Sequence, residues 1–116
     1  MNTETKYTNL DYLRLMADGD EEMVQTMLGM LLEELPEEVE KIKQLNQEQD
    51  WAELSKVSHK LKSTLAFVGN EVMANANKEI ELLSKNNEDL HRIASLLETL
   101  ETYLPPVLAE LKQHLP

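Results

Sequence analysis

The sequence predicts an all-α fold, an antiparallel four-helix bundle with a short additional N-terminal helix, in a single domain over residues 1–116. The chain has only three glycines and four prolines among 116 residues, too few turn residues for a sheet protein of this length. Helix-forming Leu, Glu, Lys, Ala, Met and Gln dominate instead. Apolar residues recur at helical spacing over four long stretches with short connections, which is typical of a bundle.

The first two helices are expected on either side of Gly19. A short helix is predicted at about residues 9–17. Asp20 then begins a second helix as its N-cap, because a side-chain carboxylate can accept hydrogen bonds from the first free amides. Apolar residues keep one face of this helix as far as Leu45. That phase continues past Pro36, so we expect one long helix with a kink at the proline.

Capping residues also divide the next part of the chain. Asp50 opens a third helix, whose apolar stripe runs to Val68. Gly69 follows at the position where a C-terminal capping glycine is expected. Asn70 can cap a fourth helix, which ends at the turn Asn86-Asn87.

A fifth helix is expected from about Leu90, with leucines spaced on one face. It contains the double proline Pro105-Pro106. Proline lacks the backbone N–H and clashes with the preceding turn, so this pair is predicted to break or kink the helix.

Charge and composition exclude several functions. Lys and Arg total 11 against 22 Asp and Glu, a formal net charge of −11, which argues against binding nucleic acid or an anionic membrane. The chain has no cysteine, so disulfides, cysteine-based zinc or iron–sulfur sites and a cysteine nucleophile are excluded. No apolar run is long enough to span a membrane, and residues 1–10 carry no signal-peptide core. We therefore expect a cytoplasmic protein.

One histidine of the third helix points away from the predicted core. At about 100° per residue, the apolar stripe lies within roughly 60° either side of Leu54, and His59 lies at about 140° from it. His59 should therefore face solvent from the middle of a rigid helix. The small or basic residues around it on this surface are Ser55, Lys56, Lys62, Ser63 and, two turns on, Ala66.

The charge around His59 is unusual for so acidic a chain. No acidic residue occurs between Glu53 and Glu71, and Lys56, Lys60 and Lys62 lie in that stretch. A neutral imidazole is a good nucleophile near neutral pH. Ammonium groups beside it would favour an anionic phosphoryl group on its nitrogen. The alternative is that these are ordinary exposed helix residues.

The stretch from His59 to Gly69, HKLKSTLAFVG, resembles the motif of the histidine-containing phosphotransfer (HPt) domain. That motif has a phosphorylated His, a Lys three residues on, a small residue, usually Gly, four on and a Gly ten on; His59, Lys62 and Gly69 match it. The resemblance covers nearly the whole chain. Its other elements are Gly19-Asp20, Leu35-Pro36, Asp50-Trp51, Met73, Ala76, Ile80 and Glu81.

The resemblance assigns roles to individual residues. It implies that His59 is the phosphoacceptor, that Lys62 is its electrostatic partner and that Glu81 hydrogen-bonds and orients the imidazole. Ser63 departs from the usual glycine and would narrow the approach of a docking partner. The residues expected to contact that partner are Ser55, Lys56, Ser63, Ala66 and Phe67.

The resemblance also implies a function. The chain would be a phosphocarrier in a two-component His–Asp phosphorelay, accepting a phosphoryl group from a receiver-domain aspartate and passing it to another receiver. Its partners would be receiver domains of response regulators and hybrid histidine kinases. It would be a monomer with no cofactor or metal of its own and no kinase activity, with Mg²⁺ on the receiver. The alternative is a phosphorylation-independent helical-bundle binding module.

Other residues have competing interpretations. Glu88 and His91 have the Glu-x-x-His spacing of di-iron bundles, but that pair is needed twice, so we expect His91 at the surface near a helix start. His114 is expected in a loose tail. Trp51 is expected to pack over the bundle end, and Phe67 either rims a docking surface or packs on a neighbouring helix.

Methionines and glutamates of the second helix are also open to interpretation. Met23, Met27 and Met30 are interpreted as core packing rather than as a partner groove. The glutamate runs at 33–34 and 37–38 are interpreted as a solvated face.

Overall fold

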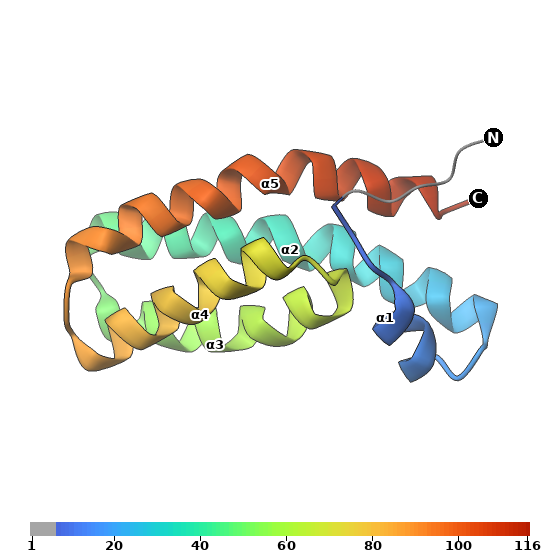
Figure 1. The fold of residues 1–116 in the computed structure, drawn as a ribbon, viewed down its shortest axis with the longest axis horizontal. Coiled ribbons are helices and arrows are strands. Elements are labelled where there is room, and N and C mark those ends of the chain that lie inside the picture. The colour runs from blue at the N-terminus through green and yellow to red at the C-terminus, as the bar shows by residue number, and fades with distance from the viewer. Residues whose placement is uncertain (1–6) are drawn as a thin grey trace.

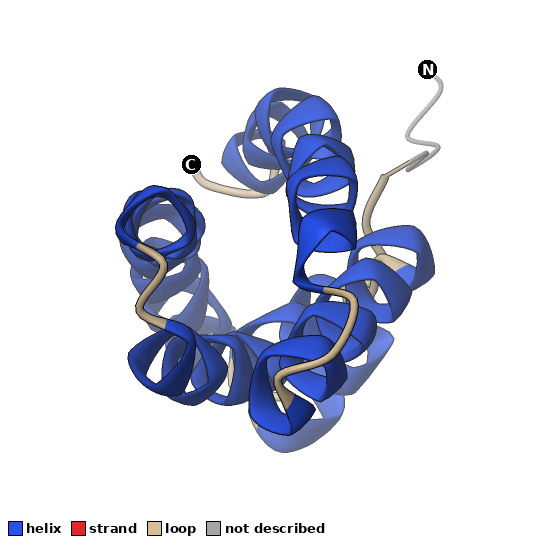
Figure 2. Cartoon of the chain, turned by 90° about the vertical axis from the view of Figure 1, so that its left-hand side faces the viewer, coloured by secondary structure: helices blue, strands red, loops and turns tan. Residues whose placement is uncertain are grey.

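The computed structural model describes residues 7–116 and confirms the predicted fold. Four long helices pack as a bundle, and a short N-terminal helix lies across one end (Figure 1). Viewed end-on, the long helices surround a common centre (Figure 2). The elements are α1 (Asp11–Met16), α2 (Glu21–Glu48), α3 (Trp51–Val68), α4 (Glu71–Asn86), the 3₁₀ turn η1 (Leu90–Arg92) and α5 (Ile93–Gln113).

The predicted caps form. The Asp20 carboxylate accepts hydrogen bonds from the amides of Glu22 and Met23, and Asp50 and Asn70 cap α3 and α4 in the same way. These caps satisfy amides that have no partner inside the helix. The residues that end α2, α3 and α4 adopt the left-handed conformation, which turns the chain back sharply; they are Gln49, Gly69 and Asn87.

The prolines do not interrupt the helices. Pro36 lies inside a continuous α2, which confirms the single long helix predicted there, whereas the kink at the proline stays a prediction. Of the two outcomes predicted for α5, the break is wrong, because this helix runs through Pro105 and Pro106 without interruption, and the kink stays a prediction. Pro105 is exposed, so water can reach the side of the helix that lacks the hydrogen bonds. Leu100 and Val107, on either side of the pair, are both fully buried, and their burial favours one continuous helix.

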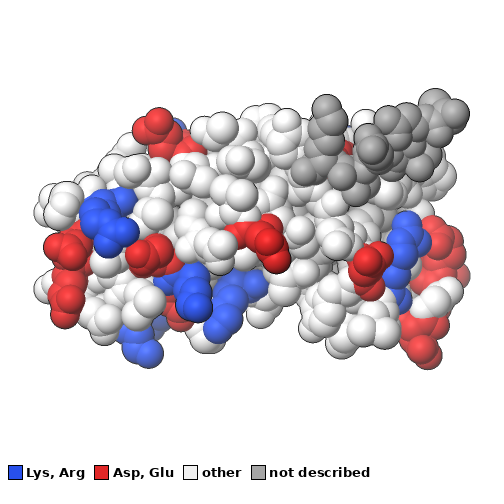
Figure 3. All heavy atoms as spheres, viewed as in Figure 1, with Lys and Arg blue, Asp and Glu red and all other residues white. Residues whose placement is uncertain are grey.

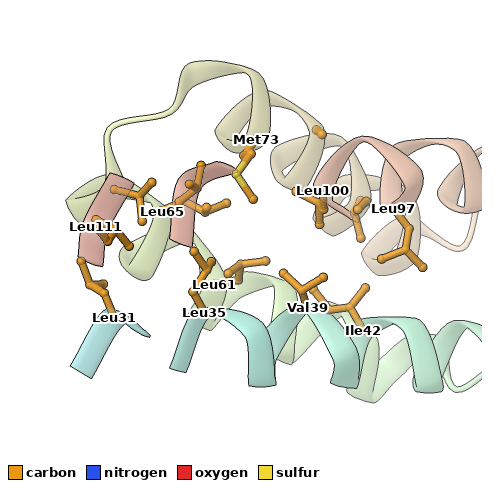
Figure 4. Packing of buried hydrophobic residues seen from close by; sticks show 14 of the residues in the cluster. Leu31, Leu35, Val39, Ile42, Leu61, Leu65, Met73, Leu97, Leu100 and Leu111 are labelled. Atoms are coloured by element: carbon orange, nitrogen blue, oxygen red, sulfur yellow. The ribbon is translucent and has the colours of Figure 1, made fainter. Parts of the chain in front are cut away.

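The core is built from the inward faces of all four long helices. In Figure 4, leucines of α2 and α3 face Met73 of α4 and the leucines of α5. Within the predicted stripe of α3, however, Val57 is only half-buried, and Ser58 and Thr64 are buried beside the leucines. Two polar residues therefore share the core face of the helix that carries His59.

The segment before α1 is anchored to the far end of the chain. The carboxylate of Glu110 on α5 accepts hydrogen bonds from the amides of Tyr7 and Thr8 and from the Thr8 hydroxyl. The Asn9 amide donates to the carbonyl of Val68, at 2.9 Å. These bonds set residues 7–10 across the end of α3 and so position α1.

No helix within residues 7–116 has the length and apolar character of a membrane span.

Candidate functional site

His59 lies in the middle of α3, opposite the buried leucines, as the helical wheel predicts. Its side chain is 70% exposed. Its Nδ1 is 2.7 Å from Oε2 of Glu81 on α4. A carboxylate only accepts hydrogen bonds, so Nδ1 is the donor in this contact, and in the neutral imidazole Nε2 then keeps its lone pair. The structure therefore brings together His59 and Glu81, which are 22 residues apart.

A buried polar clamp holds α3 to α4 next to this contact. The Ser58 hydroxyl donates to Oδ1 of Asn77 at 2.6 Å, and the Asn77 amide donates to the Ser58 carbonyl at 2.9 Å. Both residues are at most 1% exposed, and buried hydrogen bonds of this kind fix the register of neighbouring helices. The clamp was not among the predictions, although Ser58 interrupts an apolar stripe at a core position.

The lysines around His59 differ in their partners. Lys56 pairs with Glu53 at 3.8 Å, and Lys60 pairs with Glu38 at 3.7 Å. Lys62, one turn from His59, makes no ion pair among residues 7–116. On the face shown in Figure 3, basic side chains gather mainly over α3 and α4. Lys62 is therefore the lysine of this group whose charge is free to attract an anion beside His59.

A groove of about 250 Å³ between α2 and α3 borders His59. It is lined mostly by apolar side chains, together with a few polar and charged ones: Met27, Met30, Leu31, Glu34, His59, Lys60, Ser63, Thr64 and Phe67. Of the residues predicted to dock a partner, Ser63 and Phe67 line this groove. Ser55, Lys56 and Ala66 do not.

Two apolar predictions near this groove are resolved. Phe67 stacks on Tyr12 of α1, with ring centroids 5.3 Å apart, which confirms the predicted packing on a neighbouring helix. It also lines the groove, and its role in docking a partner stays a prediction. Core packing is confirmed for Met27, which packs against the core. It is wrong for Met23 and Met30, which are 46% and 53% exposed, because α2 turns that edge toward solvent rather than toward a neighbouring helix.

Glu38 departs from the predicted solvated face. Glu33 and Glu37 are exposed, but Glu38 is 6% exposed. Its Oε1 accepts the hydroxyl hydrogen of Thr64 at 2.9 Å. Burial raises the pKa of Glu38, against the opposing effects of the Thr64 hydrogen bond and the Lys60 charge. The packing of α2 against α3 encloses this carboxylate. Glu38 stands three residues after Leu35 and four before Ile42, so helical spacing places it beside the apolar stripe, a signal that the prediction from the glutamate run did not use.

We expect Glu38→Gln to raise the free energy of unfolding at neutral pH. Glutamine keeps an oxygen for the Thr64 hydroxyl and removes a charge whose burial opposes folding. Because the folded-state pKa of Glu38 is raised, the parent loses stability as pH rises through that value. The gain should therefore be largest at neutral pH and disappear below the ordinary glutamate pKa of 4.5. Urea unfolding at neutral pH and at a pH below 4.5 measures this gain in stability. A variant less stable than the parent at neutral pH would mean that the ion pair with Lys60 stabilises the fold by more than the burial of the Glu38 charge destabilises it.

The remaining candidates lie away from this site. His91 is exposed in η1 and Trp51 packs partly buried against the core, as predicted. The loose tail predicted for His114 is wrong. His114 is half-buried at the end of α5, and its carbonyl accepts a hydrogen bond from Gln25 of α2. Within the described part of the chain, no three His, Asp or Glu side chains gather as a metal site would require.

A comparison with known protein families matches residues 26–115 to the Hpt domain. The chain belongs to the Hpt domain family. Searches of curated proteins and of solved structures gave no match. The matched segment contains His59, Lys62, Gly69 and Glu81, whereas α1 precedes it.

Family membership gives this Hpt domain a role in histidine phosphotransfer within phosphorelay signalling, in which Hpt domains interact with receiver domains. The site agrees with that chemistry, because it offers an exposed imidazole held at one nitrogen. Ser63, in place of the usual glycine, is exposed and lines the groove beside His59.

Proposed function

We propose that this Hpt domain is a phosphocarrier in a two-component His–Asp phosphorelay, with His59 as the phosphoacceptor. It would take the phosphoryl group from a receiver-domain aspartate and pass it to a second receiver. The observation that carries the proposal is the 2.7 Å contact between Nδ1 of His59 and Glu81 on a side chain that is 70% exposed. This contact leaves Nε2 available to a partner at the surface.

The transfer step follows from this geometry. Nε2 attacks the phosphorus of the aspartyl phosphate in line, an N–P bond forms, and the P–O bond to the aspartate breaks. The receiver's aspartate leaves as a carboxylate. The imidazole keeps its Nδ1 proton, so the ring gains positive charge, which the Glu81 carboxylate offsets. The reverse step, with a second receiver, returns His59 to its neutral form. Positioning and electrostatics dominate such transfers.

The partner would dock over the face that surrounds His59. The groove beside His59 offers Phe67 and Met30 as apolar contacts and Ser63 at its wall. Ser55, Lys56 and Ala66 would contact the partner outside the groove. We propose receiver domains of response regulators and of hybrid histidine kinases as the partners, with the Mg²⁺ of the reaction on the receiver. The Hpt domain would act as a cytoplasmic monomer without a cofactor or kinase activity of its own.

Incubation with a phosphorylated receiver tests the proposal. The chain should acquire a phosphate that is labile in acid and stable in alkali, as a phosphoramidate bond is, and an added second receiver should remove it. The alternative is a binding module that docks a partner through the same groove without phosphorylation. Receiver binding without any transfer of phosphate would support that alternative and contradict the phosphocarrier.

Lys62→Ala should slow transfer about fivefold, because an exposed charge contributes about 1 kcal/mol or less. Lys62 makes no ion pair among residues 7–116, whereas Lys56 is already paired with Glu53. Lys56→Ala is therefore the matched control and should have a smaller effect. Single-turnover rates with one receiver make the comparison, and equal rates for Lys62→Ala and the parent would show that its charge is incidental.

Ser63→Leu should block transfer while leaving the fold intact, because residue 63 is exposed and lines the groove beside His59. A bulkier side chain there keeps the receiver's aspartyl phosphate away from Nε2. Ser63→Gly should transfer at least as fast as the parent and cost roughly 0.5 kcal/mol of stability inside a helix. Parental rates for Ser63→Leu would show that the partner docks elsewhere.

A further inference from the structure

A buried ion pair lies beside the candidate phosphorylation site. The side chain of Glu38 is 7% exposed, and its Oε2 makes no hydrogen bond within residues 7–116. That oxygen is 3.7 Å from Nζ of Lys60, whose own side chain is 70% exposed. One end of the pair is thus fixed in the protein interior, and the other reaches the surface.

Stability does not explain this pair. A carboxylate taken out of water loses hydration that one exposed ammonium restores only in part, and an apolar residue of similar size often serves a fold as well or better. Burial raises the pKa of Glu38, and the neighbouring charges of Glu34 and Glu37 raise it further. The other charge that acts on Glu38 is Lys60, which lowers this pKa. The Thr64 hydrogen bond and the Lys60 charge therefore both favour the ionised form of Glu38, and Lys60 is the one of these two partners whose side chain is mostly exposed.

Lys60 and His59 border the same groove. Lys60 has a long, flexible and mostly exposed side chain, so its ammonium can move within the groove toward the His59 ring. A phosphoryl group on Nε2 would bring a more concentrated negative charge to the groove than the single, partly compensated carboxylate of Glu38. The Lys60 ammonium would then bind the phosphoryl oxygens in preference to the Glu38 carboxylate.

We propose that Lys60 is a second phosphoryl-binding residue, which Glu38 holds until the phosphoryl group arrives on His59. The inference rests on the proposed function of His59. When Lys60 moves to the phosphoryl group, Glu38 loses its cationic partner, the protonated form of its buried carboxyl is favoured, and it takes up a proton from solvent. When the group leaves, Glu38 releases that proton and Lys60 returns. Glu38 is thus a positioning residue, acting through Lys60.

The direct test is NMR of the Glu38 carboxyl carbon, assigned by its loss in Glu38→Gln. The chain is phosphorylated with potassium phosphoramidate, a small donor that needs no receiver, and spectra are recorded at neutral and alkaline pH. The Glu38 signal should shift toward its protonated position on phosphorylation of the parent. In Lys60→Gln it should shift much less. Glu34, which lines the same groove, reports the direct effect of the new charge.

Transfer equilibria with a phosphorylated receiver provide the second readout. Lys60→Gln should lower the equilibrium constant for phosphorylating His59 about threefold, the size expected for one exposed charge. Glu38→Gln should raise it, because Lys60 no longer has to leave a partner, and should have no effect in the Lys60→Gln background. If Glu38 has only a structural role, Glu38→Gln should leave the equilibrium constant for phosphorylating His59 unchanged in the parent and in the Lys60→Gln background alike.

The outcomes separate the two proposals. An identical Glu38 shift in the parent and in Lys60→Gln would overturn the exchange. If phosphoramidate labels His59 but no receiver transfers its phosphoryl group to the chain, the phosphocarrier function alone is contradicted. The NMR signal of the Glu38 carboxyl carbon would then still decide the role of Lys60. Failure of phosphoramidate to label His59 would contradict both.

Discussion

His59→Gln should abolish phosphorylation of the chain and leave its fold unchanged. Glutamine has no ring nitrogen with a free lone pair, so no N–P bond can form. The parent side chain is 70% exposed and lies off the core, so stability should stay within about 0.5 kcal/mol of the parent. Acid-labile phosphate after incubation with a phosphorylated receiver, together with urea unfolding, measures both effects.

The other two histidines provide matched controls. His91 lies in η1 and His114 ends α5, and neither lines the groove beside His59. His91→Gln and His114→Gln should therefore accept phosphate at the parental rate. Loss of labelling in either variant, or its persistence in His59→Gln, would refute the assignment of His59.

Gly69→Ala should be the most destabilising of the three glycine-to-alanine substitutions, with a loss of roughly 2–4 kcal/mol. Gly69 has φ +74°, which costs a residue with a Cβ about 1–2 kcal/mol. A Cβ there would also collide with the carbonyl oxygen of Asn9 and lie 2.8 Å from the Asn9 Cβ. Asn9 cannot withdraw without losing its hydrogen bond to Val68. Thermal unfolding should show a fall in Tm of about 10 °C or more.

The other glycines separate the two causes of this loss. Gly19 has a similar φ of +76° but no atom within 4 Å of an added Cβ, so Gly19→Ala should cost about 1–2 kcal/mol. Gly29 lies in α2 with open space around it, and Gly29→Ala should stabilise the chain by up to about 1 kcal/mol. Equal losses at Gly69 and Gly19 would show that the contact with Asn9 contributes nothing.

Local signals predicted most of the fold. Asp20, Asp50 and Asn70 cap helices because a short polar side chain can reach the amides one turn ahead, whatever lies further away. The apolar period likewise depends on residues three or four positions apart, so it placed His59 on the solvent side of α3 before any partner helix was known. The local expectation that proline breaks a helix failed at Pro105 and Pro106, because burial of Leu100 and Val107 on either side of the pair maintains the helix.

The candidate site was predicted in part, and from two kinds of argument. Exposure of His59 among lysines follows from the helical wheel. The roles of Lys62 and Glu81 came from the resemblance to the HPt motif. Helical spacing already places Lys62 one turn from His59 on α3, whereas no spacing rule relates His59 to Glu81 on α4. The proximity of Glu81 to His59 is a property of how α3 packs against α4, and the Ser58–Asn77 clamp that secures this packing was not predicted.

The sequence by itself determined the helices, their caps and the side of α3 on which His59 lies, because each depends on residues within about one turn. Only the tertiary structure decided which polar residues are buried and which apolar ones are exposed. Glu38 is enclosed because α3 covers it, and Met30 is exposed because no helix covers that edge of α2. Burial depends on the neighbouring surface, and a residue's own sequence context does not contain that surface.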